Sequence, residues 1–383
     1  MRNDTEVTSA PVAAIVRLQL FKASEVFISE QVNALTRFRP VLIGRDCVGS
    51  PKNDFEYRVM APASRPLRAI RAGFGTDSFF RSALADYKPS VVHAHFGIDA
   101  VAVMNSAQSL DLPLATTFHG FDATTRFDRL LRSGSPSLIR YALGRNRLSR
   151  QGDLFICVSD FIRKKVLELG FPENKVVRHY IGTDVARFDA VSAERNEGVP
   201  IVLHVARLVE KKGTAYLLAA FARVRRQCPD SRLVIIGEGP LRAQLEAQID
   251  DLGLGDSVEM LGACSHDEVL QWLKRASIFA LPSVTASDGD TEGLPISIIE
   301  AAAAGLPIIS TWHSGIPEAI QDGVGGVLVA ERDTAALADA LRLLLLDPQT
   351  RTRMGTSAQQ FIRENFDIRT QTKKLEELYA RIR

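Results

Sequence analysis

The sequence predicts two α/β domains, each built on a parallel β-sheet. Short apolar runs alternate with helical patterns from residue 12 onward, which is typical of parallel sheets with helices on both faces. The 383 residues exceed what one core normally supports, and a polar segment at 189–200 interrupts the alternation. We therefore expect an N-terminal domain at 1–188, a second domain at 189–365 and a C-terminal helix at 366–383 that crosses back to the first domain.

The expected strands fall into two series separated by that linker. The first series lies at 12–18, 40–44, 90–96, 112–118, 153–159 and 175–180, with helices at 26–37 and 160–169 among its connections. The second series lies at 200–208, 231–239, 257–262, 277–282, 306–311 and 325–329. Ser265 and Glu268 form an expected capping box, and helices at about 334–346 and 349–382 close the chain.

Composition and charge narrow the class of protein. With 46% hydrophobic and 24% charged residues, the chain has the composition of an ordinary globular protein. No apolar run approaches the roughly 20 residues of a membrane-spanning helix, and the start MRNDTEVTSAP lacks the apolar core of a signal peptide, so we expect a cytoplasmic protein. Residues 1–183 hold 25 basic and 17 acidic residues, but no nucleic-acid-binding motif accompanies the excess, so we expect no nucleic-acid partner.

Two glutamates bracket the start of an expected helix in TEGLPISIIEAAAAG, residues 291–305. Pro295 suits the first turn of a helix, which places Glu292 in the preceding loop and Glu300 about one turn into the helix. Ligands of open parallel sheets bind at the carboxyl ends of strands, where this loop falls. The free N–H groups of a helix start attract phosphate, and neighbouring carboxylates suit sugar and ribose hydroxyls.

The segment EGLPISIIEAAAAGLPIISTWHSGIPEAI (292–320) resembles the signature of the retaining, sucrose-synthase-like glycosyltransferases, family GT4. The resemblance implies the GT-B fold, in which two Rossmann-like domains face each other across a cleft. It also implies that Glu292 contacts the donor sugar and Glu300 the nucleotide ribose. Gly293, Leu294 and Pro295 would then line the donor site.

Two further segments of the second half are similar to the same family. VARLVEKKG (205–213) resembles the family's diphosphate clamp, with Arg207 and Lys212 as its cations. Fixed cations would stabilise the charge that builds on a departing nucleoside diphosphate. IIGEGPLRAQLE (235–246) is similar to the family's G-x-G-P element, which places Gly237, Glu238 and Gly239 near the nucleotide.

The first half carries matching motifs on the acceptor side. TTFHGFD (116–122) resembles the family's H-G-x-D segment, which implies that His119 lies at the sugar ring and that Asp122 orients the loop. VVHAHFG (91–97), FKASEVFISEQ (21–31) and VTASDGDTEG (284–293) resemble bacterial exopolysaccharide transferases of the colanic-acid and amylovoran type. We expect His93 and His95 to point to opposite faces of their strand, with His95 on the acceptor side.

The loop after the first strand departs from the family pattern. Ser24 and Glu25 replace the Gly-Gly that many relatives carry, and we expect them on the acceptor side. Asp288-Gly289-Asp290 imitates the D-x-D metal site of a different glycosyltransferase fold. Because the resemblance implies that Arg and Lys neutralise the diphosphate, we expect no metal and no cofactor.

Residues 126–150 contain seven arginines and one acid among apolar side chains. Such a stretch can lie on an anionic membrane surface, or it can be a solvated helix with one apolar face. The resemblance implies transfer of a hexosyl group from a UDP- or GDP-sugar to a glycan or lipid-linked acceptor, with retention of configuration. A nucleotide-sugar epimerase or hydrolase of the same fold, or a non-catalytic nucleotide-sugar-binding protein, remains an alternative.

Overall fold

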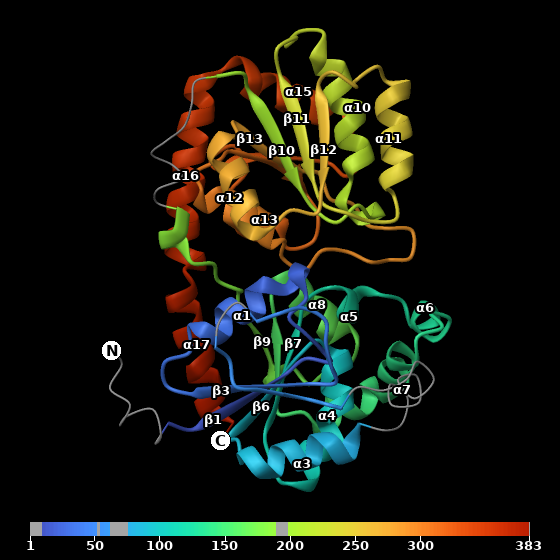
Figure 1. The fold of residues 1–383 in the computed structure, drawn as a ribbon, viewed down its shortest axis with the longest axis vertical. Coiled ribbons are helices and arrows are strands. Elements are labelled where there is room, and N and C mark those ends of the chain that lie inside the picture. Colours follow the sequence, from blue (N-terminus) through green and yellow to red (C-terminus); the bar gives the residue numbers. More distant parts are fainter. Residues whose placement is uncertain (1–9, 52–53, 62–75, 189–197, 383) are drawn as a thin grey trace. The chain divides into compact units, whose positions relative to one another are not determined.

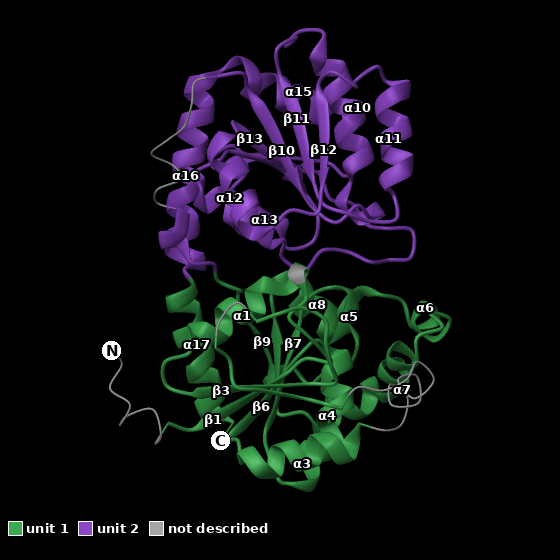
Figure 2. Cartoon of the chain, viewed as in Figure 1, with its two compact units in different colours: residues 1–182, 368–383 green, residues 183–367 purple. Residues whose placement is uncertain are grey.

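In a computed structural model of the protein, the described residues are 10–51, 54–61, 76–188 and 198–382, with the side chain of Ala23 excepted. Their chain forms two compact units (Figure 2). Unit 1 comprises residues 1–182 and 368–383, and unit 2 comprises residues 183–367. Most of the expected linker, residues 189–197, lies outside the described residues. Within the described chain, no helix combines the length and apolarity that a membrane crossing requires.

Unit 1 is built on a seven-stranded parallel sheet (Figure 1) of order β5-β3-β1-β6-β7-β8-β9. Its strands are β1 (Val12–Val16), β3 (Arg39–Gly44), β5 (Tyr57–Val59), β6 (Val91–His95), β7 (Leu114–Phe118), β8 (Leu154–Cys157) and β9 (Val176–Arg178). Its helices are α1 (Val26–Asn33), α3 (Asp77–Tyr87), α4 (Gly97–Ser109), α5 (Phe121–Thr124), α6 (Phe127–Leu131), α7 (Pro136–Gln151), α8 (Asp160–Glu168) and α17 (Ile368–Arg381). Short strands β2 (Gln19–Leu20) and β4 (Asp46–Cys47) pair beside the sheet.

Unit 2 is built on a six-stranded parallel sheet of order β12-β11-β10-β13-β14-β15. Its strands are β10 (Ile201–Val205), β11 (Arg232–Ile236), β12 (Val258–Gly262), β13 (Ile278–Leu281), β14 (Ile308–Thr311) and β15 (Gly326–Val329). Its helices are α10 (Thr214–Arg225), α11 (Arg242–Asp251), α12 (His266–Arg275), α13 (Ile296–Ala303), α14 (Ile316–Ala319), α15 (Thr334–Leu346) and α16 (Pro348–Phe366). The predicted capping box of Ser265 and Glu268 at α12 is confirmed.

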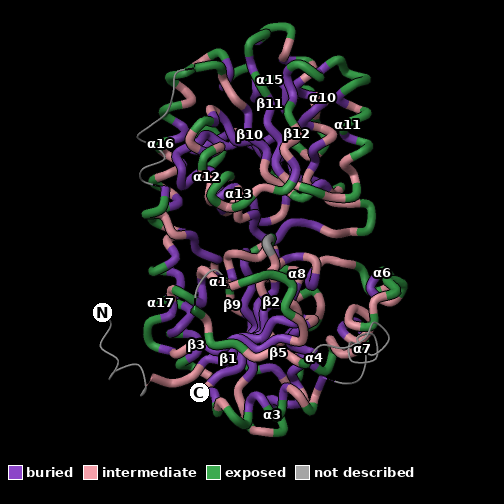
Figure 3. Tube along the Cα trace, in the orientation of Figure 1, coloured by how far each residue is buried: buried purple, intermediate pink, exposed green. Residues whose placement is uncertain are grey.

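Apolar side chains fill both faces of each sheet, as the near-continuous apolar strands predict. Figure 3 shows most strand residues of both sheets in the buried colour, with exposed residues mainly in loops and on helices. In unit 1, side chains of α1 and α17 share one core with β1 and β3, and Tyr379 of α17 is fully buried there. In unit 2, α10, α11 and α15 share a core with β10, β11 and β13.

The prediction of one helix over 349–382 is wrong, because the helix is interrupted. Asp367 has an extended conformation between α16 and α17. The backbone at this interruption bonds to Thr183 instead of continuing the helix. The Thr183 N–H donates to the Phe366 carbonyl at 2.9 Å, and Thr183 pairs with Asp367 as a β-bridge. The two chain connections between the units, at 182/183 and 367/368, are therefore adjacent.

Candidate active site

Two of the predicted site residues of unit 2, Lys212 and Glu292, lie in contact in connections that follow strands of its parallel sheet. Lys212 lies in the connection after β10, in a short 3-10 turn (Glu210–Lys212), and Glu292 lies in the connection between β13 and α13. The Lys212 Nζ lies 2.8 Å from the Glu292 Oε1, and Glu292 is only 5% exposed. Burial raises the pKa of Glu292, but the ammonium groups of Lys212 and Lys211 outweigh it and lower the pKa to about 2. Burial also lowers the pKa of Lys212, but the short contact favours the ionised pair.

A second lysine, which the sequence analysis did not single out, anchors the same loop. Lys211 is buried and donates to the Asp290 carboxylate at 3.0 Å and to the Thr291 carbonyl at 3.1 Å. The Asp288 side chain accepts from the Asp290 backbone N–H at 2.9 Å. The two acids of the D-x-D sequence therefore bond within their own loop and to Lys211.

Arg207 is exposed and lies just after the carboxyl end of β10. The backbone on either side of it packs against the predicted glycine turn at 237–239. A Cβ on Gly237 would lie 1.8 Å from the Ala206 carbonyl oxygen, and one on Gly239 would lie 2.3 Å from that of Leu208. These glycines thus permit close approach of two connecting loops. Glu238 is half-exposed, and its carboxylate pairs with Arg242 of α11 at 2.5 Å.

Helix α13 begins after Pro295, which is its N-cap and so lies one position before the predicted first turn. Gly293, Leu294 and Pro295 are buried beside Glu292. Glu300 is the fifth residue of α13, and its Oε1 lies 3.9 Å from the Nδ1 of His266 at the start of α12. The Arg187 guanidinium lies 2.8 Å from the Nε2 of that histidine. Arginine can only donate, so the proton of a neutral His266 is on Nδ1, toward Glu300.

In unit 1, His119 follows β7 in a loop that Asp122 holds in place. The Asp122 carboxylate accepts from the backbone N–H groups of His119 and Gly120 at 3.1 Å each, and from that of Gly97 at 2.9 Å. The Tyr141 hydroxyl donates to the Asp122 carbonyl. Burial raises the pKa of Asp122 to about 6, although these N–H groups oppose the shift. Asp122 therefore holds the loop of His119 through these hydrogen bonds.

Three histidines of unit 1 lie next to one another. The His95 Nδ1 lies 3.1 Å from the His119 Nε2, and the His93 and His95 rings are 4.4 Å apart. The prediction that His93 and His95 point to opposite faces is wrong, because residues two apart on a strand share a face. His93 continues the chain of contacts to the Tyr379 hydroxyl at 2.6 Å. Burial lowers the pKa of all three histidines, so these imidazoles are neutral at physiological pH.

The loop after β1 is closed by ion pairs. Arg17 pairs with Glu25 at 2.8 Å and with the buried Asp99 of α4 at 3.0 Å, and its guanidinium lies over the Phe96 ring. That ring in turn packs on His119, 4.4 Å between centroids. The Glu25 carboxylate is thus engaged by Arg17. Ser24 belongs to a 3-10 turn (Ala23–Glu25) and is exposed.

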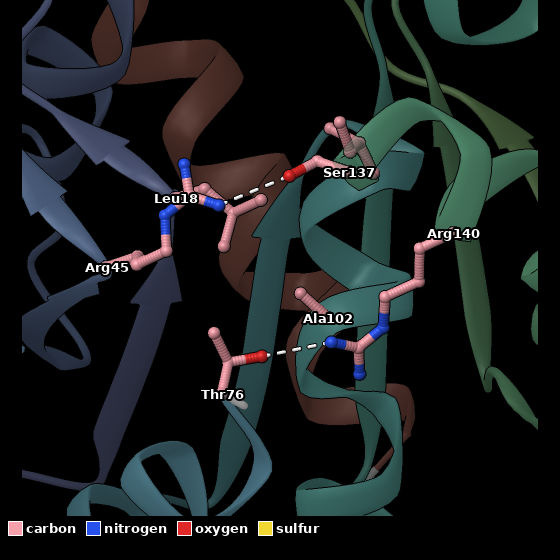
Figure 4. A pocket seen from close by; sticks show the side chains of 7 residues that line it. Leu18, Arg45, Thr76, Ala102, Ser137 and Arg140 are labelled. Atoms are coloured by element: carbon pink, nitrogen blue, oxygen red, sulfur yellow. Dashed lines mark hydrogen bonds between the residues drawn. The ribbon is translucent and has the colours of Figure 1, made fainter. Parts of the chain in front are cut away.

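A small pocket in unit 1 (Figure 4) is lined by Leu18, Arg45, Thr76, Ile98, Ala102, Ser137 and Arg140. Arg45 donates to the Ser137 hydroxyl at 3.2 Å, and Arg140 to the Thr76 hydroxyl at 3.1 Å and to Asp77 at 2.9 Å. Both guanidinium groups therefore have partners within unit 1. We assign no ligand to this pocket.

The two groups of residues can perform different chemistry. In unit 2, Arg207 and Lys212 offer positive charge, and Glu292 and Glu300 offer hydrogen-bond acceptors. Lys212 has three N–H donors and uses one on Glu292, so the others can bind an anion. In unit 1, neutral imidazoles suit a hydroxyl group rather than a phosphate.

Comparison with known proteins identifies the class. The model of the family "Glycosyl transferases group 1" matches residues 186–361, and that of "Glycosyltransferase Family 4" matches residues 24–187. The WcaL protein of Salmonella typhimurium, a glycosyltransferase assigned to colanic acid biosynthesis, is 34% identical over 293 residues, which cover 76% of this chain and 70% of WcaL. The amylovoran biosynthesis glycosyltransferase AmsK of Erwinia amylovora is 36% identical over 250 residues, 64% of this chain and 59% of AmsK.

The fold agrees with that assignment. A crystal structure of HepE from Anabaena in complex with UDP and glucose superimposes with a TM-score of 0.76 at 20% identity, over 97% of this chain and 99% of HepE. The chain therefore belongs to the family 4, group 1 glycosyltransferases, and the predicted GT-B fold class, with two parallel-sheet units, is confirmed. The roles of the individual site residues stay predictions.

Besides Lys211, two further residues near Glu292 escaped the sequence analysis. His313 and Glu331 bond to each other at 2.6 Å, and His313 accepts from the Glu292 backbone N–H. His313 lies inside the segment 292–320 that carries the family resemblance. It follows β14, which pairs with β13, and this position at the end of a neighbouring strand could have marked it as a site residue. Glu331 follows β15, the strand next to β14, but its sequence carries no motif.

Proposed function

We propose that this protein is a retaining hexosyltransferase that uses a UDP- or GDP-sugar in bacterial exopolysaccharide biosynthesis, with a glycan or lipid-linked acceptor. The observation that carries the proposal is the buried Lys212–Glu292 pair, with Arg207 and Glu300 on the same unit. Support for the donor class comes from HepE, which binds UDP. Support for the pathway comes from WcaL and AmsK, whose names refer to colanic acid and amylovoran.

Each residue has a definite task in the proposed reaction. Arg207 and Lys212 bind the diphosphate, Glu292 accepts from a donor-sugar hydroxyl, and Glu300 accepts from the ribose hydroxyls. The bond between the anomeric carbon and the phosphate oxygen breaks with its electron pair going to the nucleoside diphosphate. An acceptor oxygen bonds to the same face of that carbon, and its proton passes to the leaving phosphate.

Stabilisation of the leaving charge supplies most of the proposed rate enhancement. Positive groups that gain interaction only as the phosphate departs lower the barrier selectively. His119, held by Asp122, stabilises the sugar's developing positive charge through its backbone carbonyl and binds a sugar hydroxyl through its neutral ring. Two protein cations take the part that a divalent ion plays in other glycosyltransferases, so the proposed reaction uses no metal and no cofactor.

We further propose peripheral attachment of unit 1 to the cytoplasmic face of an anionic membrane. Arg126, Arg129 and Arg132 are exposed on or beside α6, and Phe127 between them is 46% exposed. A basic residue near an anionic surface contributes about 1 kcal/mol. Replacing the three arginines by serine should lower binding to vesicles of phosphatidylglycerol by about 100-fold. Equal flotation of the variant and the wild type would contradict the attachment.

Product analysis tests the proposed reaction. Wild-type protein is incubated with UDP- and GDP-sugars, with and without oligosaccharide and lipid-linked acceptors, and the products are separated and examined by proton NMR. Acceptor-dependent product with the donor's anomeric configuration is the expected result. Free or altered sugar without acceptor would identify a hydrolase or epimerase, and binding without any turnover would identify a non-catalytic protein.

A further inference from the structure

A buried histidine lies between Glu292 and an acid from a neighbouring loop. His313 follows β14 and is 2% exposed. Its Nε2 lies 3.2 Å from the backbone nitrogen of Glu292, and its Nδ1 lies 2.6 Å from the Oε1 of Glu331, just after β15. The connections after β13, β14 and β15 therefore meet at this ring.

The bonding partners fix the protonation of the ring. A backbone N–H can only donate, so the Nε2 of His313 must accept from Glu292. The ring proton is therefore on Nδ1 and is donated to the Glu331 carboxylate. Glu331 is itself held, because the Thr285 N–H donates to its Oε2 at 2.8 Å and the Thr285 hydroxyl to its Oε1 at 3.2 Å. Hydrogen bonds thus link Glu292 through His313 to Glu331, which also accepts from Thr285.

The adjacent residue holds the other backbone group of Glu292. The Ser314 hydroxyl donates to the Glu292 carbonyl, and Ser314 has a φ of 55°, a conformation that residues other than glycine adopt infrequently. Both backbone groups of Glu292 are therefore bonded by the turn at 313–314. Its carboxylate is left to Lys212 and to the Ser283 hydroxyl, which lies 3.4 Å away.

We propose that His313 and Glu331 are positioning residues that set the place of Glu292 against the donor sugar. The inference rests on the proposed function, because it takes Glu292 as the group that binds the sugar. A displacement of about 1 Å at a reacting centre can lower the rate by about 100-fold, so a rigid backbone there matters for turnover. Neither residue needs to touch the donor for this role.

Glu331→Gln is the informative variant, because both carboxylate oxygens accept from N–H donors. An amide turned either way places its NH2 group against the ring N–H of His313 or the Thr285 N–H. His313→Ala removes the link altogether, whereas His313→Gln keeps one neutral donor and one acceptor. Asp339→Asn is the matched control, since Asp339 is an exposed acid of α15 that forms an ion pair with the exposed Arg342.

We expect Glu331→Gln and His313→Ala to lower kcat by about 10- to 100-fold, with His313→Gln intermediate and Asp339→Asn unchanged. The dissociation constant of UDP or GDP, which lack the sugar, should stay within about twofold in the folded variants. A wild-type kcat in Glu331→Gln, or a loss of nucleotide affinity equal to the loss of kcat, would overturn the positioning role.

Histidine NMR gives a readout that does not depend on turnover. Nitrogen and carbon shifts of full-length protein, with the His313 signals assigned from their absence in His313→Gln, report which ring nitrogen carries the proton. The proposal requires the Nδ1–H form in the wild type and a change of the His313 ring shifts in Glu331→Gln. An Nε2–H form in the wild type would overturn it. If no donor is turned over, the proposed function fails, and the tautomer still decides this inference.

Discussion

The two units carry different chemistry at the carboxyl ends of similar parallel sheets. In unit 2 the predicted residues form a direct ion pair between Lys212 and Glu292. In unit 1 the predicted residue His119 contacts His95, a second neutral imidazole, while the charged Arg17 pairs with acids behind the Phe96 ring. We propose from this difference a division of labour, in which unit 2 binds anionic phosphate and unit 1 binds neutral hydroxyl groups.

Among the substitutions that test this difference between the units, removal of Lys212 should have the largest effect on activity. Lys212→Ala deletes a cation proposed to bind the leaving diphosphate, and it leaves Glu292 buried without that partner. We expect kcat to fall by about 100- to 1,000-fold, the range found when one transition-state donor is removed. The measurement is initial-rate kinetics with the accepted donor. Arg223→Ala, which removes an exposed cation from α10, is the control and should retain full activity.

Acid should weaken the protein through Glu292. The pKa of this carboxylate is about 2 in the folded chain and 4.5 in the reference state. A depressed pKa contributes stability that is complete above pH 4.5 and is lost as the pH falls through 2, about 3 kcal/mol in total. Urea unfolding at pH 6 and pH 3 should show a smaller acid loss in Glu292→Gln than in the wild type. Equal losses in both proteins would contradict the assigned pair.

The contribution of Asp122 in unit 1 to stability should change with pH in the opposite direction to that of Glu292. Its folded pKa of about 6 exceeds the reference value of 3.8, so its contribution is complete below pH 3.8 and is lost as the pH rises through 6. Asp122→Ala also leaves three backbone N–H groups without their acceptor, and we expect a loss of about 2 kcal/mol of unfolding free energy at neutral pH. Urea unfolding measures this free energy, and the value for Asp122→Asn should lie between those of the wild type and Asp122→Ala.

The smallest effect is expected at Glu238. Its carboxylate is half-exposed and pairs with Arg242, so Glu238→Ala should change the unfolding free energy by less than about 1 kcal/mol. Donor affinity measured by calorimetry should be unchanged if the glycine turn acts through its backbone. A clear loss of affinity would instead assign the side chain to the donor.

The local rules of the sequence predicted much of the fold. Apolar runs located the strands of both sheets except β5 (Tyr57–Val59), because buried parallel strands need continuous apolar residues. Ser265 and Glu268 marked the start of α12, because a capping box satisfies its first N–H groups. The interruption at Asp367 escaped prediction, since its β-bridge partner Thr183 lies far away in the sequence.

The site was predictable where a motif carried it and not where distant loops meet. The Glu292 and Lys212 segments were found separately, but their direct contact depends on loops 80 residues apart, after β10 and β13. The bond between His313 and Glu331 depends on the pairing of β14 with β15. The error over His93 and His95 was of another kind, because the two-residue period of a strand already places them on one face.

Calorimetric titration of the full-length protein with the nucleotide sugar that it turns over tests the central claim most directly. If unit 2 binds the diphosphate through Lys212, the dissociation constant should rise by about tenfold or more in Lys212→Ala and stay unchanged in Arg223→Ala. Equal affinity in the wild type and Lys212→Ala would contradict the account.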